Sequence, residues 1–177
     1  MGYEISGALG VKIAEPDKEV YAFIGDGVFM MGHSNLYTSL QEGKKINIIL
    51  FDNNGHQCIH NLQRSQGIDS FGTEFRYRDQ ETNRLTGGYA PVDFAAIARG
   101  YGAKAYTVTR IDQLAEALEM AKKDTLSTLI EIKVLPGTMT EGYESFWRVG
   151  TPKIAESENV QKAGQKMREV VKDARKF

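Results

Sequence analysis

Two apolar segments that end in glycine, carboxylate and amide groups constrain the fold of this sequence most. The segment 19–24 (EVYAFI) is followed by GDG at 25–27, and the segment 46–51 (INIILF) is followed by DNNG at 52–55. Both read as buried strands, and the second is almost wholly apolar, as a strand covered on both faces should be. A helix predicted between them completes a strand-helix-strand unit, which requires a parallel sheet.

The rest of the sequence continues this alternation. Helices are predicted at 2–14, 28–42, 92–101, from 111 onward and at 160–174, and further strands at 104–108 and 128–134. A capping box of Thr109 and Asp112 is expected to start the helix at 111, with Ile111, Leu114, Ala115 and Leu118 on one face. Residues 53–92 interrupt the rhythm, with a short helix predicted near 58–63. We therefore expect a single domain, 1–177, with an α/β fold and a parallel sheet flanked by helices.

The ends of the two strands carry side chains suited to a cation. Ligands of open parallel sheets bind beyond the carboxyl ends of the strands, where Asp26 offers a carboxylate oxygen and Asn53 an amide oxygen. Mg²⁺ prefers oxygen ligands of this kind. The predicted helix from Val28 presents free N–H groups that favour an anion. These residues together predict a site for Mg²⁺ bridged to a diphosphate.

The spacing of these residues resembles the cofactor motif of thiamine-diphosphate enzymes, in which GDG is followed after about 25 residues by Asn-Asn. The resemblance implies that Asp26 is the first Mg²⁺ ligand, an Asn amide the second and a main-chain carbonyl two residues later the third. If the glycines are aligned, the ligands are Asn53 and the carbonyl of Gly55, because Asp52 then stands at the family's first Asn. A literal match of Asn-Asn would choose Asn54 instead.

The same resemblance implies the other cofactor contacts. Met1 stands where the family places a large apolar side chain that supports the bent cofactor. Gly25, Gly27 and Val28 are expected to bring backbone close to the diphosphate. His56 replaces the usual aromatic residue and is expected to touch cofactor or substrate. No catalytic residue is identified, since the family's glutamate that activates the aminopyrimidine belongs to another domain and comes from the neighbouring subunit.

Four stretches point to one branch of the family. They are MGYEISGALG at 1–10, LQEGKKIN at 40–47, SFGTEFR at 70–76 and EGYES at 141–145. They resemble the cyclic-dione hydrolases of myo-inositol catabolism, which open a ring by cleaving a C–C bond and adding water. The alternatives are an acetolactate-synthase-like carboligase, or a non-catalytic phosphate-binding α/β module. The second lacks support because neither a Walker-type GxxxxGK[ST] nor a GxGxxG is present.

The family's other domains are absent from this sequence. The resemblance implies a pyrimidine-binding and a central domain in addition to this one, so we expect either the C-terminal part of a longer enzyme or a separate subunit. A homodimer or homotetramer is expected to complete the site, and residues 1–177 alone are expected to bind the cofactor weakly and to have no turnover.

Composition excludes several other classes of protein. The net charge of −1 argues against a nucleic-acid binder. The single cysteine, Cys58, fits a reducing compartment. No run approaches the ~20 apolar residues of a membrane helix, and the first residues lack the pattern of a signal peptide. A cytoplasmic protein is therefore expected.

Other reactive residues are expected to have structural roles. His33 is predicted to pack or cap within its helix, His60 to lie at the surface or in a loop, and Cys58 to be buried. The aromatic residues Tyr143, Phe146 and Trp147 are expected to pack against the missing domains.

Overall fold

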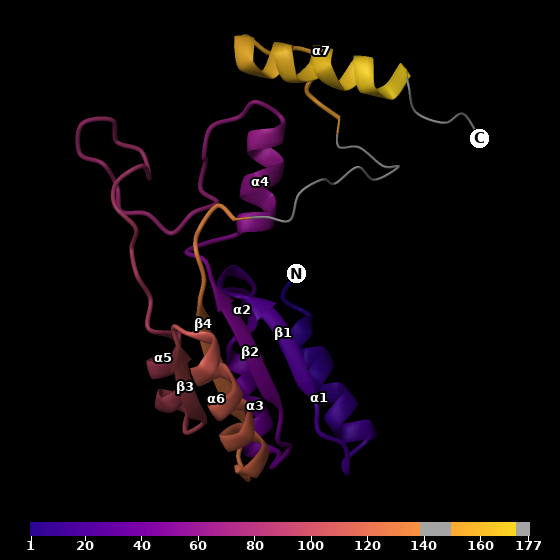
Figure 1. Ribbon diagram of the computed structural model, residues 1–177, viewed down its shortest axis with the longest axis vertical. Helices are drawn as coiled ribbons and strands as arrows, with labels where there is room; N and C mark the ends of the chain where they lie inside the picture. The colour runs from indigo at the N-terminus through magenta and orange to yellow at the C-terminus, as the bar shows by residue number, and fades with distance from the viewer. Residues whose placement is uncertain (139–149, 173–177) are drawn as a thin grey trace. The chain divides into compact units, whose positions relative to one another are not determined.

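The computed structural model describes residues 1–138 and 150–172, which fall into two compact units (Figure 1). Unit 1 contains residues 1–56 and 90–136. Unit 2 contains residues 57–89 and the described residues from 137 onward. The stretch 141–145 and the aromatic residues that follow it lie outside the described residues.

Unit 1 is built on a parallel four-stranded sheet. Its strands are β1 (Tyr21–Gly25), β2 (Asn47–Asp52), β4 (Thr128–Lys133) and β3 (Lys104–Val108), in the order β1-β2-β4-β3. Every neighbouring pair is parallel, so the carboxyl ends of all four strands lie at one edge of the sheet. The predicted α/β fold with a parallel sheet is confirmed.

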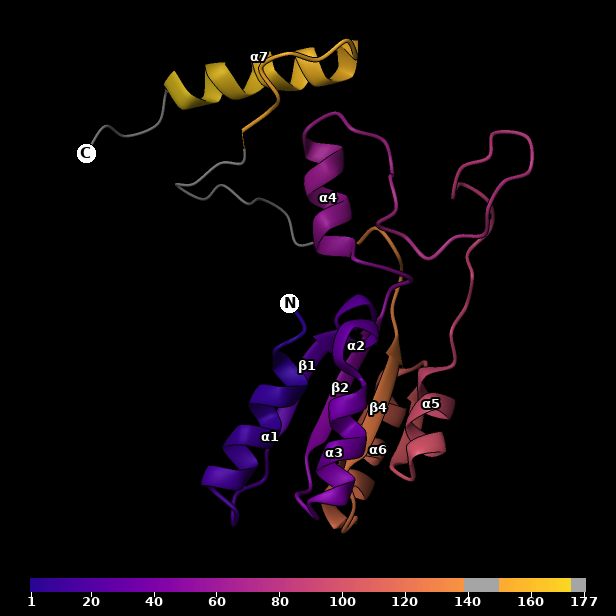
Figure 2. The same ribbon diagram turned by 180° about the vertical axis from the view of Figure 1, so that it is seen from behind.

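Helices cover both faces of this sheet (Figure 2). One face carries α1 (Glu4–Ala14), α2 (Asp26–Gly32), α3 (Ser34–Gln41) and α5 (Phe94–Tyr101), and the other carries α6 (Ile111–Lys123). The helix predicted at 28–42 is thus two helices. The first, α2, begins at Asp26, and His33 separates it from α3. The ring of His33 stacks on Phe29 and its Nδ1 lies 2.8 Å from the hydroxyl of Tyr101, in agreement with its predicted packing role.

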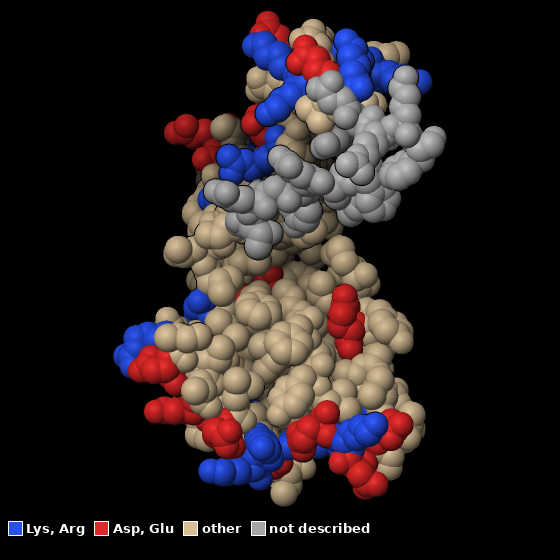
Figure 3. Space-filling model, turned by 45° about the vertical axis from the view of Figure 1, so that its right-hand side comes forward, with Lys and Arg blue, Asp and Glu red and all other residues tan. Residues whose placement is uncertain are grey.

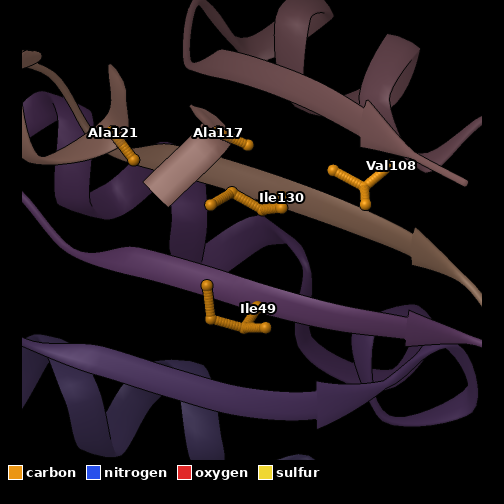
Figure 4. Packing of buried hydrophobic residues seen from close by; sticks show 5 residues of the cluster. All are labelled: Ile49, Val108, Ala117, Ala121 and Ile130. Atoms are coloured by element: carbon orange, nitrogen blue, oxygen red, sulfur yellow. The ribbon is translucent and has the colours of Figure 1, made fainter. Parts of the chain in front are cut away.

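The packing beneath α6 determines which side of this helix faces the sheet (Figure 4). Ile49, Val108 and Ile130 of the sheet pack against Ala117 and Ala121, whose small side chains allow the helix to approach the sheet closely. The inner face therefore consists of Leu114, Ala117, Leu118 and Ala121.

The predicted inner face and cap of α6 were partly wrong. Ile111 is 82% exposed and Ala115 is exposed as well, because both lie outside the stripe that Ala117 and Ala121 define. The first turn is capped by the Gln113 side chain, whose oxygen accepts the backbone N–H groups of Thr109 and Arg110 at 3.0 and 3.2 Å. The carboxylate of Asp112 pairs with the side chain of Arg110 instead of capping the helix.

The edge strand β1 departs in part from the prediction of a buried strand. Ala22 and Ile24 are buried under the helices of one face. Tyr21 and Phe23 point to the opposite face and remain exposed, because α6 covers that face only over β3 and β4. In unit 1, few charged side chains lie at the centre of the face seen in Figure 3. An edge position explains the alternation, since only one side of β1 meets helices.

Unit 2 contains two helices and a long loop that is held by polar contacts. The helices are α4 (Gln57–Ser65) and α7 (Glu158–Lys172). In the loop, Glu74 receives two hydrogen bonds from Arg76, at 3.1 Å each, and one from the Tyr89 hydroxyl at 3.0 Å. His60 was predicted at the surface or in a loop, but it lies on α4 and is buried, with its Nδ1 3.2 Å from the Thr73 hydroxyl oxygen.

Two further observations concern the remaining predictions. Cys58, predicted to be buried, is exposed at the start of α4. None of the helices within the described residues is long and apolar enough to span a membrane.

Candidate functional site

Asp26 ties the ends of β1 and β2 together. It follows β1 directly and is fully buried. Its Oδ1 accepts the N–H of Gly27 at 2.7 Å, and its Oδ2 accepts the N–H groups of Asn53 at 3.1 Å and Gly55 at 2.9 Å. One carboxylate thus fixes the backbone of the loop that follows the neighbouring strand, 27 residues further along the sequence.

The side chain of Asn53 turns back toward the same carboxylate. One terminal atom of its amide lies 2.9 Å from the carbonyl oxygen of Gly55 and 3.1 Å from Oδ1 of Asp26. In the absence of a cation, hydrogen bonding favours the orientation that places the amide nitrogen at this position. Its nitrogen there would donate to both oxygens, whereas its oxygen there would complete a group of three oxygens, one each from Asp26, Asn53 and Gly55.

Burial perturbs the acidity of Asp26. Its pKa is raised from 3.8 to about 6, mainly by desolvation and also by the nearby carboxyl of Asp52, although the N–H groups of Gly55 and Gly27 oppose the shift. A buried carboxylate beside a second acidic group favours either a proton or a cation. The strand ends therefore bring acidic, largely desolvated oxygen atoms close together.

Asp52 is the second acidic group, and Lys133 is its ion-pair partner. The Nζ of Lys133 on β4 contacts the carboxylate of Asp52, which is its register partner on β2. The same Nζ lies 2.6 Å from Glu131, whose other oxygen accepts the Thr107 hydroxyl at 3.1 Å. Asp52 also accepts the N–H of Asn54 at 3.2 Å.

Gly27 leaves room for the His56 imidazole. A Cβ at position 27 would lie 2.3 Å from Nδ1 of His56, so the ring packs directly on the backbone of the first turn of α2. Gly25 precedes this turn in an extended conformation, with φ −88° and ψ 162°, and Val28 lies within it, partly buried. His56 therefore adjoins both the loop after β2 and the start of α2.

The structure brings together most of the residues selected from the sequence. Asp26 accepts hydrogen bonds from Gly27, Asn53 and Gly55. The ring of His56 packs on Gly27. Met1 is exposed at the start of the chain. Asn54 has a left-handed backbone, φ 61°, and is one of two non-glycine residues with positive φ in the described ranges.

Lys133 and Glu131 were not selected from the sequence. The sequence pattern of β4 could have indicated them, because two charged residues alternate there with apolar ones on a strand that lies between β2 and β3. Within residues 1–138 and 150–172, no group of three or more His, Cys, Asp or Glu side chains is arranged to hold a metal. The oxygens gathered at Asp26 include only one such side chain.

Comparison with known proteins identifies the kind of domain. Residues 1–132 match the family described as thiamine pyrophosphate enzyme, C-terminal TPP binding domain. A solved structure of a thiamine diphosphate-dependent 4-hydroxybenzoylformate decarboxylase from Rhodococcus jostii superimposes with a TM-score of 0.61 over 77% of this chain and 23% of that protein, at 23% identity. At this identity the likeness concerns the fold alone.

Curated relatives are much more similar in sequence. A 3D-(3,5/4)-trihydroxycyclohexane-1,2-dione hydrolase 2 of Bacillus cereus is 62% identical over 92% of this chain and 25% of its own length. The hydrolase 1 of the same species is 59% identical over 100% of this chain and 28% of its length. A Bacillus anthracis hydrolase of this name is 58% identical over the same shares. The chain thus spans about a quarter of the length of these relatives.

Proposed function

Because the chain belongs to the family of thiamine pyrophosphate enzymes, as their C-terminal cofactor-binding domain, we propose that residues 1–177 are a single such domain, which holds thiamine diphosphate through Mg²⁺. The observation that carries this proposal is the convergence of Asp26, Asn53 and Gly55 at the ends of β1 and β2. This edge of a parallel sheet is where ligands of α/β proteins bind.

The donor set fits Mg²⁺. Octahedral Mg²⁺ with ligands at 2.0–2.1 Å places adjacent oxygens about 2.9 Å apart. The terminal atom of Asn53 lies 2.9 and 3.1 Å from oxygens of Gly55 and Asp26, so its amide oxygen in that position would give the expected ligand spacing. Asn53 is the ligand in this proposal, rather than Asn54, because the side chain of Asn53 lies beside the oxygens of Asp26 and Gly55.

The other selected residues surround the diphosphate in this proposal. Gly25, Gly27 and Val28 would bring backbone to the phosphate oxygens, and His56, packed on Gly27, would line the same end of the cofactor. Met1 would support the bent cofactor, as the family resemblance implies. These residues bind and orient the cofactor, and no residue of this chain is proposed to transfer a proton.

The reaction is proposed from the relatives. We assign to the complete enzyme the opening of the trihydroxycyclohexane-1,2-dione ring by hydrolysis of a C–C bond in inositol catabolism, because relatives at 58–62% identity bear that name. When bound, thiamine diphosphate would supply a nucleophilic carbon for addition to a carbonyl and a positively charged ring that takes up the electrons released by C–C cleavage. Further domains and a second subunit, in a cytoplasmic homodimer or homotetramer, would complete the site.

Binding of the cofactor is tested by NMR on the ¹⁵N-labelled chain, because chemical shifts report weak binding. Thiamine diphosphate with Mg²⁺ should shift the amides of Gly27, Asn53 and Gly55, whereas ATP with Mg²⁺ should not. Asp26→Ala should abolish the shifts. Equal responses to both nucleotide and cofactor would favour a general phosphate-binding module.

The reaction is tested separately with the complete enzyme. It should consume the cyclic dione and show no carboligation of pyruvate. Acetolactate formation from pyruvate, without turnover of the dione, would assign the chain to the carboligases instead.

A further inference from the structure

We propose that Lys133 is a positioning residue for the cation site, which acts by anchoring Asp52 and, through it, the loop that carries Asn53 and Gly55. This inference rests on the proposed function. Lys133 lies on β4 and belongs to none of the sequence motifs considered above. Its ammonium group contacts the carboxylate that immediately precedes the cation loop.

The need for such a residue follows from the chemistry of position 52. The family motif has an Asn there, and an amide can both donate and accept hydrogen bonds, whereas an ionised carboxylate only accepts. Asp52 is 5% exposed, so water cannot fully solvate its charge. A buried carboxylate without a partner is costly, and it would also stand beside the carboxylate of Asp26.

Lys133 supplies the missing donor in a fixed place. Its Nζ contacts Asp52 and lies 2.6 Å from Glu131, and Glu131 is itself held by the Thr107 hydroxyl at 3.1 Å. Strand pairing places Lys133 directly beside Asp52, so the contact crosses between neighbouring strands of the sheet. The ammonium group is therefore held from two sides.

The anchored carboxylate in turn orders the loop. One oxygen of Asp52 contacts Lys133, and the other accepts the N–H of Asn54 at 3.2 Å, which holds the left-handed turn at that residue. The residues on either side of Asn54 are those whose oxygens converge with Asp26. Groups that orient metal ligands in this way commonly change metal affinity by about 10–100-fold when they are removed.

The experiment compares the Mg²⁺-dependent affinity for thiamine diphosphate, from NMR titration, with the free energy of unfolding in the ligand-free protein. Lys133→Met should weaken binding about tenfold or more, whereas Lys133→Arg should retain it. Asp52→Asn combined with Lys133→Met should restore binding to within about threefold, because the amide no longer needs a cation. Lys45→Met is the matched control, since it removes another lysine that pairs with a glutamate, Glu19 at 3.2 Å, but at the opposite edge of the sheet, and it should leave the affinity unchanged.

The outcomes separate this inference from the proposed function. If Lys133→Met lowers stability but binds Mg²⁺ and thiamine diphosphate as well as the wild type does, the ion pair serves folding only and the inference is wrong. If Lys133→Met does not fold, the folded double variant decides: binding near the wild-type value supports the inference, and a tenfold loss overturns it. If the wild type shows no Mg²⁺-dependent binding at all, the proposed function fails, and this inference fails with it.

Discussion

The buried carboxylate of Asp26 should make the cation-free protein more stable as the pH falls from 7.5 to 5. Its pKa is about 6 in the folded protein and 3.8 as the ordinary value, so the folded state binds a proton in a range where the unfolded chain does not. Stability is therefore gained as the pH falls through about 6. This direction is opposite to that of most carboxylates, which are stabilised in their charged form.

The magnitude follows from the two pKa values. A difference of about 2 pKa units corresponds to roughly 3 kcal/mol between the fully ionised and fully protonated limits. Between pH 7.5 and pH 5 the linkage relation gives about 1.4 kcal/mol of that amount. Glu74 acts in the other direction, since hydrogen bonds led by Arg76 outweigh its desolvation and lower its pKa to about 2, but its effect is felt mainly below pH 5.

Urea unfolding at several pH values, with and without Asp26→Asn, measures this contribution. The wild type should gain about 1.4 kcal/mol more than the variant on going from pH 7.5 to 5, because the amide does not titrate. Mg²⁺ with thiamine diphosphate should remove or reverse the difference, since the proposed cation site requires the ionised carboxylate. An identical pH dependence in wild type and variant would refute the reasoning.

Three substitutions test the packing around the site and in unit 2. Gly27→Ala should destabilise unit 1 by about 1–3 kcal/mol, because its Cβ would lie 2.3 Å from His56, and His56→Ala in the same chain should recover most of the loss in urea unfolding. Phe29→Ala should cost about 3–5 kcal/mol by the same measurement, since this fully buried ring packs edge-on against a second phenylalanine at 5.6 Å. Gly67→Ala should cost more than Gly72→Ala in thermal unfolding, because both glycines have positive φ but only at position 67 would a Cβ meet the backbone of α7, at 2.4 Å; equal costs would contradict this.

The fold of unit 1 could be predicted because local patterns and tertiary packing agree there. The β-rich segments, the apolar run before Asp52, and Gly43 and Gly102 after two of the helices indicated parallel strands linked by helices. The phase of α6 could not be predicted, because it is set by two alanines packing on the sheet, and the periodicity of Ile111 and Leu114 fits more than one phase.

The candidate site could be predicted only in part, for a similar reason. The spacing of Asp26 and Asn53 along the sequence sufficed to place two strand ends together. Lys133 lies more than 70 residues further along the sequence than Asn53, and only the strand order β1-β2-β4-β3 places it beside Asp52. The buried position of His60 likewise involves a contact with the hydroxyl of Thr73, which lies in a loop without a regular sequence pattern.

The three N–H groups held by Asp26 also bear on how affinity is distributed in this fold. The loop after β2 is already ordered before any ligand arrives, so the entropy of ordering it is lost during folding rather than during binding. Affinity for a ligand at this edge then depends on the integrity of the whole sheet. A substitution deep in the core, far from any ligand atom, would weaken binding by loosening the loop and would mimic the loss of a direct contact.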